Sequence, residues 1–104
     1  MSDCTNIQNA LLKYIIKYAG IKKRPWLSLC CFIDSNNKKY VYTLYIESMG
    51  EHDKEKIKKL LKENFNIDDS FIKQDNSVIS YLLDSNTYLN LVTLLKISGE
   101  ARSI

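Results

Sequence analysis

The chain has 104 residues, 45% of them hydrophobic and 26% charged, which predicts one small globular domain spanning 1–104 with a single core. So high an apolar fraction excludes an intrinsically disordered chain. No apolar run reaches the roughly 20 residues of a membrane helix, and the N-terminus lacks the basic-then-apolar pattern of a secretory signal. The formal net charge is +3, and only Arg24 and Arg102 among the 15 basic residues are arginines. This balance gives only weak support to an acidic partner.

Three cysteines, Cys4, Cys30 and Cys31, show no CxxC spacing. On a strand the adjacent Cys30 and Cys31 point to opposite faces, so they do not readily share a disulfide or a metal ion. Three unpaired thiols indicate a reducing compartment, and we expect a cytoplasmic protein. The abundance of Lys, Asn and Ile is typical of AT-rich genomes, such as those of many bacteria and large viruses.

The first predicted element is a helix over 6–19. Thr5 and Gln8 match a capping box, and Gly20 lies where a helix usually ends. Apolar residues occupy more than half of the circumference of this helix. We therefore expect it to be buried over more than half of its circumference.

A basic connector at 21–25 leads into a predicted β-hairpin. Runs rich in β-forming residues at 26–33 and 39–47 are separated by a polar turn at 34–38. Successive residues of a strand point to opposite faces, and both sets of alternate residues in these runs are largely apolar or aromatic. Both faces of the hairpin are therefore expected to be covered, either by helices of the chain or by a partner.

The second half of the chain predicts a helix, a shorter hairpin and a third helix. These elements are placed at 51–64, at 71–73 and 77–83 with a turn at 74–76, and at 87–97 after a cap at 84–86. Residues 100–104 are expected to form a frayed tail. The predicted order is α-ββ-α-ββ-α, an α+β fold in which three helices pack on a small antiparallel sheet. This order of elements is similar to that of small bacterial secretion chaperones, an analogy of fold alone.

The residues that commonly carry catalysis are few and scattered. His52 is the only histidine, and a cysteine nucleophile would need the hairpin that holds Cys30 and Cys31 to meet the start of the helix at 51–64. The acids at 68–69 lack the glycine and the alternating acids of a calcium loop, and the three separate glycines form no phosphate-binding loop. We therefore expect no enzyme activity, no metal and no cofactor.

The excess of apolar surface is the strongest functional signal in the sequence. The hairpin and two of the three helices have more apolar surface than a chain of this length easily buries, unless helices cover both faces of the sheet. We therefore expect a protein-binding module, such as a small adaptor, a chaperone-like protein or an inhibitor, that occludes a partner protein and forms a homodimer. The predicted interface combines the surplus face of the 6–19 helix with Trp26, Phe32, Tyr45, Lys22, Lys23 and Arg24. Trp26, the only tryptophan, is the predicted hot spot.

A nucleic-acid-binding protein is the alternative interpretation. The segments 22–26 and 38–42 combine basic residues with aromatic rings, a pattern that suits phosphates and stacked bases. The modest net charge and the scarcity of arginine weigh against it. No membrane partner is expected.

Overall fold

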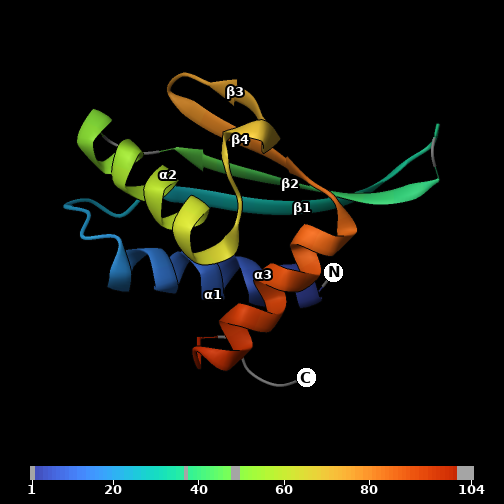
Figure 1. The fold of residues 1–104 in the computed structure, drawn as a ribbon, viewed down its shortest axis with the longest axis horizontal. Coiled ribbons are helices and arrows are strands. Elements are labelled where there is room, and N and C mark those ends of the chain that lie inside the picture. The colour runs from blue at the N-terminus through green and yellow to red at the C-terminus, as the bar shows by residue number, and fades with distance from the viewer. Residues whose placement is uncertain (1, 37, 48–49, 101–104) are drawn as a thin grey trace.

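The computed structural model describes residues 2–36, 38–47 and 50–100. Within these ranges, three helices and a four-stranded antiparallel sheet follow one another in the order α-ββ-α-ββ-α, which confirms the predicted fold class (Figure 1). The elements are α1 (Ser2–Tyr18), β1 (Trp26–Asp34), β2 (Lys39–Glu47), α2 (Glu51–Phe65), the 3₁₀ turn η1 (Asp69–Phe71), β3 (Ile72–Asp75), β4 (Val78–Leu83) and α3 (Ser85–Ile97). None of the described helices is both long and apolar enough to cross a membrane.

The capping box predicted at the start of the first helix is wrong. The helix begins at Ser2, so Thr5 lies inside its first turns and does not cap it. Gln8 makes a tertiary contact instead: its side-chain oxygen Oε1 accepts a hydrogen bond from the backbone N–H of Leu29 at 3.0 Å. A capping-box pattern is local and cannot reveal that helix-compatible residues precede it. At the other end Gly20 has a φ of 69°, the left-handed conformation expected just after a helix.

The second hairpin turns later than predicted, because Gln74 and Asp75 belong to β3 and pair with Ser80 and Ile79 of β4. Its turn lies at 76–77, where the Asn76 side chain accepts a hydrogen bond from the N–H of Val78 at 3.1 Å. The third helix starts two residues earlier than predicted, after the N-cap Asp84. Of the predicted tail at 100–104, residues 101–104 lie outside the described residues.

The strand order of the sheet is β1-β2-β4-β3, so the two hairpins join through β2 and β4. All nine residues of β1 pair with β2, from Trp26 opposite Glu47 to Asp34 opposite Lys39. The ladder between β2 and β4 begins only at Tyr42, which pairs with Leu83. The part of the first hairpin beyond this point, residues 32–34 and 39–41, is therefore a two-stranded arm that projects from the sheet (Figure 1).

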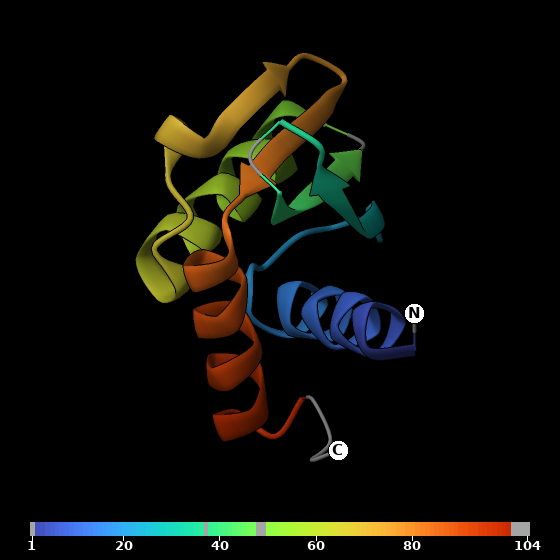
Figure 2. The same cartoon turned by 90° about the vertical axis from the view of Figure 1, so that its right-hand side faces the viewer.

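One face of the sheet carries all three helices (Figure 2). Alternate strand residues point to these helices and are buried: Leu27, Leu29, Leu44, Ile46, Ile79, Tyr81 and Leu83. They form a single core with apolar side chains of all three helices, such as Ile15, Leu61 and Leu91. The possibility that helices cover both faces of the sheet is therefore not realised in the described chain.

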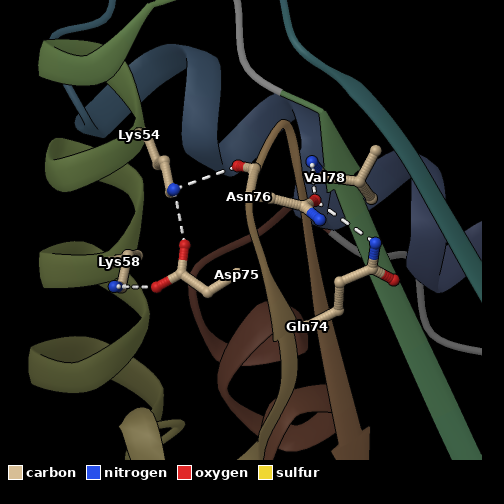
Figure 3. Close-up of polar contacts among 6 residues, drawn as sticks. All are labelled: Lys54, Lys58, Gln74, Asp75, Asn76 and Val78. Atoms are coloured by element: carbon tan, nitrogen blue, oxygen red, sulfur yellow. Dashed lines mark hydrogen bonds and ion pairs between the residues drawn. The ribbon is translucent and has the colours of Figure 1, made fainter.

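The edge strand β3 is held by α2 through charged side chains (Figure 3). Lys54 and Lys58, one turn apart on α2, place their Nζ atoms 2.5 and 2.8 Å from the carboxylate of Asp75. Lys54 also donates a hydrogen bond to the backbone oxygen of Asn76 at 3.0 Å. Helix and hairpin turn are thereby fixed to each other at the end of β3.

Candidate interaction surface

The face of the sheet opposite the helices is left open, and we call it the open face. It is formed by Trp26, Ser28, Cys30 and Phe32 of β1, Val41, Thr43 and Tyr45 of β2, and Val78, Ser80 and Leu82 of β4. Its middle holds small side chains, of which Thr43 and Ser80 are only 7% exposed although no helix lies over them. Its ends carry large rings, with Trp26 57% and Phe32 48% exposed. The result is a surface of mostly small polar and apolar side chains, with one exposed aromatic ring at the start of β1 and another near its end.

The three aromatic residues predicted to bind a partner all lie on this open face. Tyr45 is opposite Ser28 in the ladder and is a diagonal neighbour of Trp26, which is opposite Glu47. Phe32 is six residues from Trp26 along one strand, a separation of roughly 20 Å at about 3.3 Å per residue. Trp26 and Tyr45 therefore form one aromatic group, and Phe32 stands apart at the base of the arm.

The predicted basic residues lie beside the Trp26 end of the open face. The carboxylate of Asp53, itself only 7% exposed, accepts hydrogen bonds from the backbone N–H groups of Lys22 and Lys23 at 3.2 and 3.3 Å. This contact ties the connector to the first turns of α2 and leaves the side chains of Lys22, Lys23 and Arg24 exposed. Three positive charges thus lie just before Trp26 in the chain, and the carboxylates of Glu47, Glu51 and Asp53 lie at the same end of the hairpin.

The surplus face of the first helix does not join this surface. The exposed apolar side chains of α1, Ile16 and Tyr18, belong to the helix layer on the other side of the sheet. The same holds for Leu89 and Ile97 of α3. The interface predicted from the sequence is therefore divided between the two sides of the sheet.

The candidate catalytic side chains do not come together. Cys30 and Cys31 are both exposed, on opposite faces of β1. His52 lies in the first turn of α2, which follows the Trp26–Glu47 end of the hairpin, whereas Cys31 is five residues from that end, roughly 16 Å along the strand. Among the described residues no three His, Cys, Asp or Glu side chains are grouped as a metal site would require.

The two segments of the nucleic-acid alternative lie at opposite ends of the first hairpin. Eight residues, roughly 26 Å of strand, separate the Trp26 end from the Lys39 end. Tyr42 points to the helices, where its ring stacks on Tyr88 of α3 with centroids 3.7 Å apart, so it is not available to a base. Tyr40 is two residues from Tyr42 on the same strand, so it also points away from the open face. The structure therefore forms no single patch from 22–26 and 38–42.

Sequence reasoning missed the free edge of β1. Because the N–H of Leu29 donates to Gln8 and not to β2, the backbone N–H and C=O groups of Leu29 point away from the sheet. The same outward direction recurs at every second residue, and so at Leu27, Cys31 and Ile33. Among the described residues, no hydrogen-bond partner is found for the outward N–H groups of Cys31 and Ile33. Only the strand order identifies β1 as an edge, and that order has no local sequence signal.

Comparison of the chain with protein-family models, with curated proteins and with solved structures gives no match. The functional assignment therefore rests on the geometry described above.

Proposed function

We propose that this protein is a non-enzymatic binding module, an adaptor, chaperone-like protein or inhibitor, that self-associates and occludes an apolar, acid-bordered surface of a partner protein. One observation carries the proposal: the sheet has a face with exposed aromatic residues that no helix of the described chain covers. Exposed apolar surface of this kind is typical of protein-protein contact sites.

The Trp26 end of the open face is the centre of the proposed contact. Tryptophan and tyrosine are enriched among the residues that dominate binding energies, and Trp26 and Tyr45 are diagonal neighbours there. The exposed side chains of Lys22, Lys23 and Arg24 beside them favour acidic groups at the border of the partner's surface. Steering by these charges raises the association rate, and the rings supply most of the affinity.

Replacing Trp26 by alanine tests this proposal. Proteins captured by the wild type are identified, and a purified binder is titrated against the wild type, Trp26→Ala and Leu89→Ala, whose altered side chain is exposed on the helix side. Trp26→Ala should weaken binding about thirtyfold, the equivalent of about 2 kcal/mol, with little change in thermal stability. Leu89→Ala should bind like the wild type. Equal binding by all three proteins would contradict the proposal.

Two further measurements separate the other functional classes. A folded variant with Cys30→Ser, Cys31→Ser and His52→Gln should keep the cellular function, since catalysis by this chain would depend on at least one of these residues. Titration with single-stranded RNA and DNA at two salt concentrations should show no tight binding. Micromolar binding with a steep salt dependence would support the nucleic-acid alternative instead.

A further inference from the structure

The outward backbone groups of β1 are complementary to those of the same edge in a second copy, in one antiparallel register. Gln8 occupies the outward N–H of Leu29, and the turn of the hairpin follows Asp34. Between these limits, the outward-pointing backbone groups belong to Cys31 and Ile33, which are placed symmetrically about Phe32. An antiparallel copy of the same segment offers a donor opposite each acceptor and an acceptor opposite each donor.

We infer that a second copy of this chain pairs antiparallel with the edge of β1 so that Phe32 lies opposite Phe32 of the second copy, which joins the two sheets into one. In this register, Cys31 of each copy is opposite Ile33 of the other, and each of these two pairs exchanges two main-chain hydrogen bonds. Shifting the register by two residues either way is less favourable. One shift needs the N–H of Leu29 that Gln8 occupies, and the other places Cys31 opposite the turn.

The side chains of the arm match this arrangement. Phe32 meets its copy in a non-hydrogen-bonded pair, the position where side chains of an antiparallel ladder approach most closely, and aromatic pairs are favourable there. On the other face, Ile33 of each copy lies beside Cys31 of the other, next to Tyr40, which is opposite Ile33 in the hairpin. Ile33 and Tyr40 are 59% and 56% exposed in the single chain, so this contact would cover apolar surface that the chain leaves bare.

The size of the contact predicts a modest affinity. Phe32, Ile33 and Tyr40 of both copies together have roughly 600 Å² of exposed surface, if large side chains bury about 150–250 Å² each when fully covered. Stable interfaces usually exceed about 1,000 Å², so side chains alone place this contact among the weaker ones, before main-chain pairing is added. We expect dissociation in the micromolar range.

A proline on the free edge tests the contact. Ile33→Pro removes an N–H that points away from β2, so the hairpin ladder stays intact while pairing with a second copy loses two donors and meets the proline rings. Ile33→Val is the matched control because it keeps the N–H. Sedimentation equilibrium over the micromolar range should show a dimer for the wild type and for Ile33→Val. Ile33→Pro should dissociate at least thirtyfold more readily, with circular dichroism and unfolding midpoint near those of the wild type.

Cysteine cross-linking tests the register. In a background with Cys4→Ala, Cys30→Ser and Cys31→Ser, Phe32→Cys should form a disulfide-linked dimer on mild oxidation, because opposed residues in this pair have Cα atoms about 4.5 Å apart. Val41→Cys, on the same face but one strand further from the edge, should stay monomeric under the same conditions. If Phe32→Cys fails to cross-link, or if a variant that keeps Cys31 as its only cysteine links to its copy instead, the register is wrong.

The inference rests on the self-association in the proposed function, and the two fail differently. A dimer that survives Ile33→Pro would overturn the β1 contact and leave self-association standing. A wild type that stays monomeric throughout the micromolar range would overturn both. Partner binding through Trp26 is independent of either result, since it is measured with Trp26→Ala.

Discussion

The two edges of the sheet differ in how they are protected against pairing with another strand. β3 is four residues long, is interrupted between Ile72 and Gln74 by a register shift at Lys73, and is attached to α2 by the contacts of Asp75 (Figure 3). β1 is nine residues long, continuous in register and uncharged before Asp34, and among the described residues only the side chain of Gln8 bonds to its backbone edge. Short length, bulges and charge are the devices that prevent edge-to-edge association. Within the described chain they are present at β3 and largely missing at β1, so β1 is the edge at which we propose self-association.

The charges at the β3 edge also influence each other's protonation. Hydrogen bonds from Lys54 and then Lys58 lower the pKa of the Asp75 carboxyl, and the hydrogen bond to Asp75 raises the pKa of the Lys58 amine. Both groups are partly exposed, so water screens the interaction and its contribution to stability is small. The β3 edge is therefore protected against strand pairing by its charges and its irregular geometry, although the ion pairs add little to the stability of the fold.

The largest expected effect is the difference in unfolding free energy lost by a substitution at the centre of the sheet and by one at the free edge. Leu44→Ala on β2 removes a fully buried side chain beneath the sheet and should lower the free energy of unfolding by about 2–5 kcal/mol. Ile33→Ala on the arm should change it by less than about 0.5 kcal/mol when measured below the dissociation constant of the dimer. Urea unfolding followed by circular dichroism measures both. Comparable losses would show that the arm is packed and not exposed.

Removing the Gln8 contact at the β1 edge has a smaller effect. Gln8→Ala leaves the N–H of Leu29 without its acceptor and should cost about 1 kcal/mol of unfolding free energy. The Leu29 amide should also exchange its hydrogen faster with solvent. Asn9→Ala, at an exposed position of the same helix, is the control and should change neither quantity. Unchanged exchange at Leu29 in Gln8→Ala would mean that Gln8 does not protect this edge.

At the β3 edge the expected loss is smaller again. Asp75→Asn keeps the shape of the side chain but removes its charge, and should lower the free energy of unfolding by at most about 1 kcal/mol. The loss should shrink at high salt because exposed charges are screened. Lys59→Ala, elsewhere on α2 and outside the ion pairs of the described residues, should be neutral. A loss that does not depend on salt would assign the effect of Asp75 to packing.

The smallest effect is the pH dependence of that loss. Because the pKa of Asp75 is lowered on folding, its contribution to stability is present above the ordinary pKa of an aspartate, about 4, and is lost as the pH falls through the lowered value. The stability difference between wild type and Asp75→Asn should therefore be constant from about pH 5 to 8 and should vanish in strong acid. Paired urea titrations at several pH values measure it. A stability difference that grows on acidification would contradict a lowered pKa of Asp75 in the folded protein.

Much of the secondary structure could be predicted because its signals are local. The hairpin with strands at 26–33 and 39–47 is confirmed to within one residue, since β-rich runs around a polar turn define it without reference to the rest of the chain. The helix predicted at 51–64 is confirmed on the same basis, as Glu51 and Asp53 lie in its first turn and Lys62 in its last, which suits the helix dipole. The capping box at Thr5 and the turn at 74–76 failed because each residue pattern fits two local structures, and tertiary contacts of Gln8 and strand pairing of Gln74 select one of them.

The sequence by itself determined the elements, their order and the residues of each strand that share a face, because helical and strand periodicities and turn chemistry act over a few residues. Only the tertiary structure decided that β4 lies beside β2, that all three helices share one side of the sheet, and that β1 is left at an edge. Those choices depend on packing between segments far apart in the chain, such as Leu44 of β2 against the core shared with Leu61 and Leu91. The exposure of Trp26 and the free backbone groups of Cys31 and Ile33 follow from that packing, and so they could not be derived from periodicity alone.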